Sequence, residues 1–205
     1  ADHPGRFLIS DRLAIPTNFG SEFSKLLYAV AVAAIMPRTE TQQLLIKPLL
    51  LPALESAQQT RQEPPHELLL QDQSTIQVCY GNVTALIGYY MSDSNWLTEA
   101  ANNYQEVADT TSKDADQMAW ANVQFHLSRI RQGLGEHSND PEILENTINT
   151  LKEILEVYTL NDFPLEWGSI QSRIGNMLYR LDSLNGETEL LKESVMAYQS
   201  ALRVF

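Results

Sequence analysis

The sequence predicts an all-α protein built as a solenoid of stacked helical hairpins, and three observations support this fold class. A pattern of apolar residues recurs every 47 residues across 73–205. Within each copy the matches fall at i, i+3, i+4, i+7 and i+8, which is the spacing of one face of an α-helix. Each copy holds two such stripes separated by a polar break, so each should form a hairpin. A hairpin of this size buries its apolar faces only by stacking on its neighbours.

The repeat is clearest between 114–158 and 162–205, which superpose without a gap. A further step of 47 residues towards the N-terminus gives a third copy at 73–109. The segments "IQVCYGNVT" at 76–84 and "IQSRIGNML" at 170–178, two steps apart, share Ile-Gln and Gly-Asn in the same places. The predicted repeats are therefore 73–109, 114–158 and 162–205. The superposed pairs include Trp120 and Trp167, Gln124 and Gln171, Leu127 and Ile174, Leu144 and Leu191, and Leu155 and Leu202.

The polar breaks contain signals for the start and end of helices. The segment "DPE" at 140–142 offers an N-cap, a proline at the first helical position and an early acidic residue. The segment "NG" at 185–186 supplies a turn. Small residues also recur in the first helix of each repeat, at Gly81, Ser128 and Gly175. We expect these small residues to allow a close approach where the two helices of a hairpin cross.

The N-terminal third does not repeat clearly. We expect an arm at 1–20 and helices at 21–66 that form either a degenerate first repeat or a cap of the solenoid. The segment "EFSKLLYAVAVAAIMP" at 22–37 predicts a helix that is apolar on every side and ends before Pro37, and such a helix must be covered by protein. A docking face for a partner or for a second copy of the chain is the alternative interpretation of this divergent region.

The segment "PLEWGSIQSRIGNMLYRL" followed by "LLKESVMAYQSALRVF" resembles the bacterial tetratricopeptide repeat (TPR) and its longer relatives. The resemblance rests on Ile174-Gly175 in the first helix and on Tyr198 and Ala201 in the second, and it covers about two thirds of the chain. The repeat is longer than the usual 34 residues of the family, and Ser194 stands where the family favours alanine. The resemblance implies a right-handed α-solenoid whose first helices line a concave groove that binds extended peptides.

The same resemblance implies which residues face the groove. The equivalent positions Asn82, Arg129 and Asn176 are similar to the asparagine-rich groove of peptide-binding TPR domains, where side-chain amides hold the peptide backbone. The lysines of the family's carboxylate clamp are missing at the matching positions, so a terminal-carboxylate ligand is not expected, although Arg173 and His126 are nearby on the same helices. The predicted partner-binding groove consists of Asn82, Asn122, Phe125, Arg129, Gln132, Arg173, Asn176 and Tyr179.

Composition argues against several classes of partner. A net charge of -12 disfavours binding to nucleic acid or to an anionic membrane surface, because both reward clustered Lys and Arg. The single cysteine, Cys79, excludes an internal disulfide and a zinc site built from cysteines. The longest apolar run, at 26–36, is far shorter than the roughly 20 residues that span a bilayer. We therefore expect a cytoplasmic protein that binds neither membrane nor nucleic acid.

The sequence contains no nucleophile paired with a base, no phosphate-binding glycine loop and no metal-binding spacing of its four histidines. We expect no catalytic residues, no cofactor and no metal. The predicted function is a non-catalytic interaction scaffold or adaptor for a protein or peptide partner. Two alternatives remain: a regulatory or sensor repeat region of a larger multidomain signalling protein, and a self-assembling module such as a homodimer. Both would explain an apolar stripe near Phe205, which more chain or another subunit would have to cover.

Overall fold

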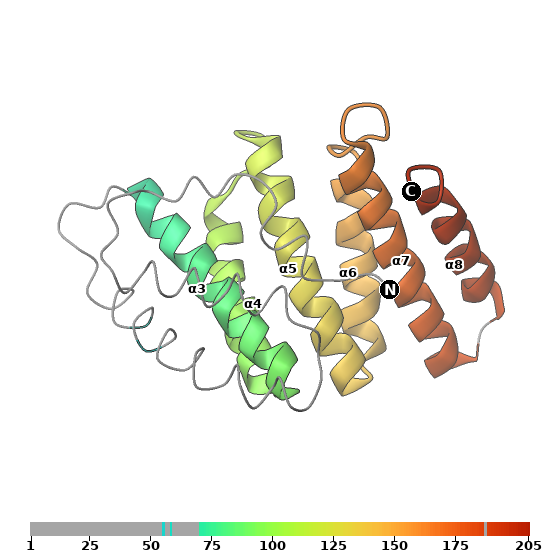
Figure 1. Ribbon diagram of the computed structural model, residues 1–205, viewed down its shortest axis with the longest axis horizontal. Helices are drawn as coiled ribbons and strands as arrows, with labels where there is room; N and C mark the ends of the chain where they lie inside the picture. The colour runs from blue at the N-terminus through green and yellow to red at the C-terminus, as the bar shows by residue number, and fades with distance from the viewer. Residues whose placement is uncertain (1–54, 56–57, 59–69, 187) are drawn as a thin grey trace. The chain divides into compact units, whose positions relative to one another are not determined.

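The computed structural model describes Glu55, Gln58 and the ranges 70–186 and 188–205 (Figure 1). Over these residues the chain is all-α, with six α-helices and no strand. The predicted arm at 1–20 and the predicted N-terminal helices at 21–66, apart from Glu55 and Gln58, lie outside the described residues. The helices are α3 (Leu70–Met91), α4 (Ser94–Thr110), α5 (Gln117–Ser138), α6 (Pro141–Ile154), α7 (Pro164–Asn185) and α8 (Thr188–Ala201).

Long and short helices alternate at a constant step. The long helices α3, α5 and α7 have 22 residues each and begin at 70, 117 and 164. The shorter helices α4, α6 and α8 begin at 94, 141 and 188. Both series advance by 47 residues, which is the step of the apolar pattern in the sequence. The local sequence therefore sets where each helix begins.

Capping residues explain these boundaries. Asp140 precedes α6, and its carboxylate accepts hydrogen bonds from the backbone N–H groups of Glu142 and Ile143 at 3.0 and 3.3 Å. This side chain satisfies two of the donors that the first turn of a helix leaves without partners. Asn139 and Gly186 end α5 and α7 in the left-handed conformation, with φ of 54° and 72°. The predicted cap at 140–142 and the predicted turn at 185–186 are both confirmed.

The chain divides into two compact units after Val107, within α4. In the first unit, α3 and α4 pack closely at two glycines. A methyl group at Gly81 would lie 2.8 Å from the ring of Tyr104, and one at Gly88 would lie 2.8 Å from the side chain of Leu97. Neither distance is tolerated, so each glycine makes room for a side chain of the other helix.

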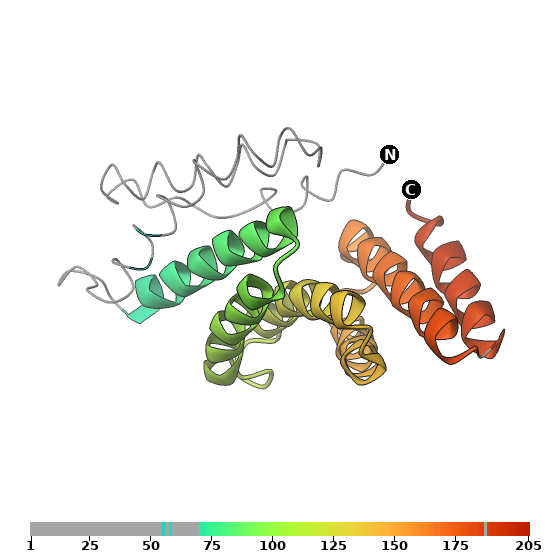
Figure 2. The same ribbon diagram turned by 90° about the horizontal axis from the view of Figure 1, so that it is seen from below.

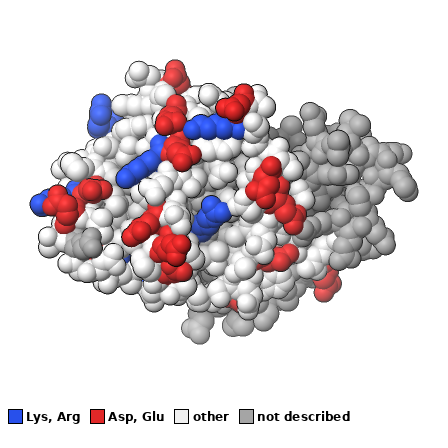
Figure 3. Space-filling view, turned by 180° about the vertical axis from the view of Figure 1, so that it is seen from behind, with Lys and Arg blue, Asp and Glu red and all other residues white. Residues whose placement is uncertain are grey.

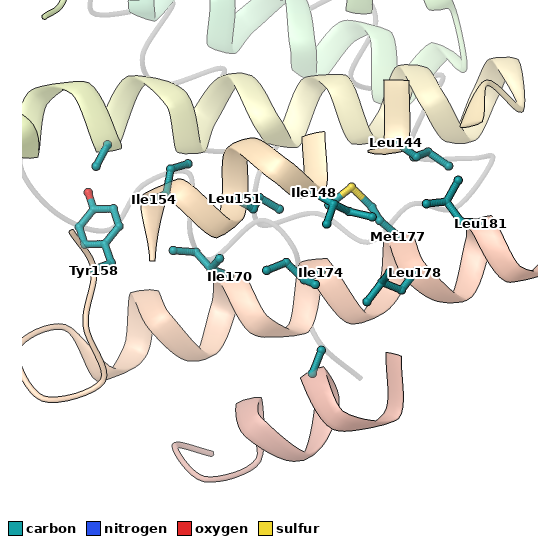
Figure 4. Close-up of a cluster of buried hydrophobic side chains, with 12 residues drawn as sticks. Leu144, Ile148, Leu151, Ile154, Tyr158, Ile170, Ile174, Met177, Leu178 and Leu181 are labelled. Carbon is teal, nitrogen blue, oxygen red and sulfur yellow. The ribbon is translucent and has the colours of Figure 1, made fainter. Parts of the chain in front are cut away.

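The second unit contains α5 to α8, and contacts join α5 to α6, α6 to α7, and α7 to α8. Helices α7 and α8 run side by side in both ribbon views (Figures 1 and 2). Apolar side chains of α6 and α7 face each other in the core of this unit (Figure 4). Full burial of each such side chain stabilises the folded state by about 1.5–3 kcal/mol. The buried cluster contains side chains from both hairpins, so one continuous core joins them. The residues labelled on these two helices are Leu144, Ile148, Leu151 and Ile154 of α6 and Ile170, Ile174, Met177, Leu178 and Leu181 of α7.

The glycine contacts of the first unit recur in the second. A methyl group at Gly135 would lie 2.7 Å from Leu144, the residue 47 positions after Leu97. A methyl group at Gly175 would lie 3.2 Å from the ring of Tyr198, the residue 94 positions after Tyr104. The prediction that small residues allow close approach is thus confirmed at Gly81 and Gly175. What fills the space is the ring of a tyrosine from the second helix.

Candidate functional site

The predicted groove residues fall on three helices in two separate units. Asn82 is on α3 of the first unit. Asn122, Phe125, Arg129 and Gln132 are on α5, and Arg173, Asn176 and Tyr179 are on α7, all in the second unit. Side-chain contacts join the groups on α5 and α7, so the candidate site is built on these two helices.

Arg173 connects α7 to α5. Its guanidinium donates a hydrogen bond of 3.0 Å from Nη1 to Oε1 of Gln132. The guanidinium carbon also lies 5.5 Å from the centre of the Phe125 ring, within the range of a cation–π interaction. Two contacts of different kinds therefore hold the Arg173 head group between residues of the neighbouring hairpin.

Gln132 is oriented from both ends of its amide. Its Oε1 accepts from Arg173, and its Nε2 donates to Oε1 of Glu136 at 2.8 Å. Through this amide, hydrogen bonds connect the guanidinium of Arg173 on α7 to the carboxylate of Glu136 on α5. The sequence pointed to Gln132 and Arg173 but not to Glu136. The spacing of four residues between Gln132 and Glu136, which places both on one helix face, is the signal that could have found it.

His126 lies near the guanidinium of Arg173, which is the positively charged group in this series of hydrogen bonds. Burial lowers the pKa of His126 to about 4, and the charges of Arg129 and Arg173 contribute in the same direction. The imidazole is therefore neutral at physiological pH, and its ring makes an edge contact with Phe125 at a centroid distance of 6.0 Å. Positive charge here comes from the two guanidinium groups, of which Arg129 is only 9% exposed.

Asn82 and Asn176 take part in the packing of their own hairpins. The hydroxyl of Tyr104 donates to Oδ1 of Asn82 at 2.8 Å, and the hydroxyl of Tyr198 donates to Oδ1 of Asn176 at 2.5 Å. The two pairs are equivalent, because each tyrosine follows its asparagine by 22 residues. Asn82 is buried, whereas Asn176 is exposed. The repeat of Asn and Tyr at a constant spacing was visible in the sequence and indicates this bond more directly than the resemblance did.

The remaining groove residues lie on the surface. Tyr179 is 58% exposed, and Asn122 is exposed as well. Burial raises the pKa of Tyr198, and the nearby groups Tyr179 and Glu136 raise it further, so these three side chains are electrostatic neighbours. We define the α5–α7 strip as Phe125, His126, Gln132 and Glu136 of α5 together with Arg173, Asn176 and Tyr179 of α7.

Charge on the molecular surface is mixed. On the face drawn in Figure 3, groups of Asp and Glu are interspersed with Lys and Arg. The acidic residues of α6 and α8 and of the turn after α6 are exposed in the described ranges. The exposed ones are Glu142, Glu145, Glu153, Glu156, Glu189 and Glu193.

Within the described ranges, no three His, Cys, Asp or Glu side chains are grouped so that they could hold a metal ion. No helix in the part of the chain that the structure describes is long and apolar enough to cross a bilayer. The chain matches no protein-family model, and neither the curated proteins nor the solved structures include a significant match to it.

Proposed function

We propose that the chain is a non-catalytic protein–protein interaction scaffold that binds an extended segment of a partner along the α5–α7 strip. The observation that carries the proposal is the position of Arg173, which reaches from α7 to Gln132 and Phe125 on α5. Through this contact, two consecutive hairpins contribute to one surface. A ligand that lies across both helices would meet aromatic, amide and guanidinium groups in sequence.

The residue types of the strip suit protein recognition. Arginine and aromatic residues are enriched at interfaces and supply most of their binding energy. Side-chain amides such as those of Gln132 and Asn176 can hydrogen-bond the backbone of an extended peptide, which carries one donor and one acceptor per residue. Because Arg173 and Gln132 are held by other side chains, less side-chain entropy is lost on binding.

Electrostatics favour a particular kind of segment. Arg129 and Arg173 lie close enough to His126 to contribute to the lowering of its pKa, so two guanidinium groups lie at this point although the chain as a whole carries a charge of -12. A partner segment with an acidic side chain at this point would be preferred. The same charge pattern predicts weaker binding as salt is raised.

We propose in addition that the scaffold has a TPR-like fold. Hairpins at a constant 47-residue step, with equivalent contacts at Gly81 and Gly175, support a right-handed solenoid of TPR type. In such a solenoid α3, α5 and α7 would be the first helices of three repeats and would line one face. We place the protein in the cytoplasm as part of this proposal.

The test is selection of peptides from a random displayed library on the purified chain, followed by measurement of the dissociation constant of the best peptide. The variant Arg173→Gln should weaken this peptide by about tenfold, which corresponds to the loss of one well-placed interface arginine. Arg203→Gln is the matched control, because Arg203 lies near Trp167 beyond α8 and away from the strip. A selected peptide that binds both variants as tightly as the parent chain would contradict the proposal, as would failure to select any peptide.

A further inference from the structure

Two arginines of α7 reach α5 by the same kind of bond. Arg173 donates to Oε1 of Gln132 at 3.0 Å, and Nη2 of Arg180 donates to Oδ1 of Asn139. In both pairs the arginine follows its amide partner by 41 residues. The two bonds are therefore seven residues apart on each helix, and α5 and α7 run in the same direction where these bonds join them.

The two bonds fix the distance between two positive charges. Seven residues correspond to about two turns of an α-helix, so the two guanidinium groups are separated by about 10 Å along α7. Glu136 lies between the bonds on α5, four residues after Gln132 and three before Asn139. The α5–α7 strip extended to Arg180 therefore carries a positive, a negative and a second positive group in this order.

Arg180 is accessible to an anionic ligand. Its side chain is partly exposed, and its hydrogen bond goes to an uncharged amide. Among the described residues, carboxylates pair with Lys113 and Lys192, at 3.0 and 2.7 Å, and none pairs with Arg180. A carboxylate of a ligand could therefore approach this guanidinium without breaking an ion pair of the described part of the chain.

The spacing of the two guanidinium groups selects one conformation of an extended ligand. In a β-strand, side chains on one face are two or four residues apart, which is about 7 or about 13 Å. In polyproline II conformation there are three residues per turn, so side chains i and i+3 share one side at a separation of about 9 Å. Of these separations, the last fits two arginines that are about 10 Å apart.

We propose that the partner segment is a polyproline II stretch with acidic residues at positions i and i+3, one bound by Arg173 and the other by Arg180. This inference rests on the proposed function, since it specifies which segment the α5–α7 strip binds. Each contact would be a hydrogen bond between a guanidinium and a carboxylate, which is stronger than a hydrogen bond between neutral groups.

Glu136 determines which residues fit between the two acids. Its carboxylate is exposed and accepts a hydrogen bond from Gln132 at 2.8 Å, which orients it. An acidic ligand residue at i+1 or i+2 would be repelled by this carboxylate, whereas an uncharged or basic residue would not. The expected ligand therefore has acidic residues at both ends of the pattern and none between them.

The α7 residues between the two arginines suit the same ligand. Asn176 and Tyr179 are both exposed, and Tyr179 is exposed by 58%. Segments in polyproline II conformation bind to surfaces lined by aromatic side chains, because their conformation is already formed before binding. The Tyr179 ring provides such a surface, and the amide of Asn176 can donate to a carbonyl group of the ligand backbone.

The test starts with selection of peptides from the random displayed library on the purified full chain. We expect the selected peptides to share two acidic residues three positions apart. A fluorescent copy of the best peptide would be compared with two further copies, in each of which one of the two acids is replaced by its amide. Fluorescence anisotropy would give the dissociation constants of the three peptides for the parent chain, Arg173→Gln and Arg180→Gln.

The substitution Arg180→Gln should weaken the unmodified peptide by about two- to fivefold, which is the range of an exposed ion pair. It should have no effect on the copy that lacks the acid bound by Arg180, because that copy does not make the contact. Arg173→Gln should have no effect on the other copy. Arg203→Gln is the control and should leave all three dissociation constants unchanged.

A further variant separates the charge of Arg180 from its hydrogen bond. Asn139→Gly removes the acceptor of Arg180, and glycine is suited to the φ of 54° at this helix end. Because the positive charge remains, this variant should weaken the unmodified peptide less than Arg180→Gln does. Both variants should keep the circular dichroism of the parent chain.

Two results would overturn this inference and leave the proposed function standing. One is a selected peptide that is weakened by Arg173→Gln but binds Arg180→Gln as tightly as the parent chain. The other is equal weakening of all three peptides by Arg180→Gln, which would give Arg180 a purely structural role. Failure to select any peptide would contradict the proposed function and this inference together.

Discussion

Tyr198 of α8 joins the two helices of its hairpin by two contacts. Its hydroxyl donates a hydrogen bond to Oδ1 of Asn176, and its ring lies against Gly175. Tyr104 makes the same pair of contacts with Asn82 and Gly81, 94 residues earlier. The asparagine and the glycine are adjacent on the first helix, so one tyrosine satisfies a polar group and fills a space at the same point. This arrangement connects the repeat in the sequence to a specific contact between two helices.

Gly175→Leu should destabilise the chain. A methyl group at Gly175 would already lie 3.2 Å from the Tyr198 ring, and a leucine requires that ring to leave its place. Overpacking of this kind costs about 1–3 kcal/mol, more than the roughly 1 kcal/mol that removal of a helical glycine returns. Urea unfolding measures the difference. Glu166→Leu, at an exposed position of the same helix, is the control and should change stability by less than about 0.5 kcal/mol.

Tyr104→Phe should cost more stability than Tyr198→Phe. Both remove a hydroxyl that donates to an asparagine, but Asn82 is 8% exposed whereas Asn176 is open to water. A buried acceptor left without its donor costs about 1–3 kcal/mol, and water can replace the donor at the exposed site. Thermal unfolding of the two variants, compared at one pH, gives the order. Equal losses would show that burial of Asn82 does not matter.

Asn82 is for the same reason an unsuitable residue for testing ligand binding. Asn82→Ala removes the acceptor of the Tyr104 hydroxyl in the interior of the first hairpin. We expect this variant to lower the midpoint of thermal unfolding, so that any loss of ligand capture could follow from partial unfolding. Variants of the exposed residues Tyr179 and Asn122 should not have this effect. A midpoint unchanged by Asn82→Ala would contradict this expectation.

His126 should make stability depend on pH. Its folded pKa of about 4 lies below the value of 6.5 for an unperturbed histidine, so the unfolded chain binds a proton first as the pH falls. The buried neutral imidazole of His126 therefore contributes fully to the unfolding free energy above pH 6.5. As the pH falls towards 4, this contribution decreases by about 2–3 kcal/mol. The unfolding free energy of the parent chain should therefore fall more steeply between pH 7 and pH 4 than that of His126→Gln.

A second histidine provides the control for this pH dependence. His137 lies exposed in the last turn of α5, away from Arg129 and Arg173. The variant His137→Gln should retain the steep pH dependence of the parent chain. If His126→Gln and the parent gave parallel curves, the imidazole of His126 would not be shielded from protonation in the folded state.

Asp140→Ala should destabilise α6 through its N-terminus. The carboxylate of Asp140 accepts from two backbone N–H groups, at 3.0 and 3.3 Å, and alanine leaves both without a side-chain partner. Loss of an N-cap costs about 0.5–2 kcal/mol. Chemical denaturation followed by circular dichroism measures the change. Asp140→Asn, which keeps an acceptor oxygen, should recover most of the loss; failure of this rescue would point to charge instead of hydrogen bonding.

The sequence predicted helices at a 47-residue step, and the structure has them. Local signals sufficed for the cap at Asp140 and the turn at Gly186, because a cap and a turn depend only on neighbouring residues. The resemblance assigned both Asn82 and Asn176 to the groove. In the structure Asn82 is buried and Asn176 is exposed, because burial depends on what packs around each hairpin. Glu136 belongs to the site because Gln132 donates a hydrogen bond to it. The spacing of apolar residues in the sequence does not predict such a polar contact.

The sequence by itself determined the helices and their 47-residue step, because helix periodicity and capping are properties of short stretches of chain. Only the tertiary structure decided which polar side chains would be used within a hairpin and which would face solvent. It alone brought Arg173 of α7 to Gln132 and Phe125 of α5, since these residues are more than 40 positions apart. It also distinguished α6 from α8, whose apolar faces are equivalent in sequence, by covering one face with a helix and leaving the other exposed.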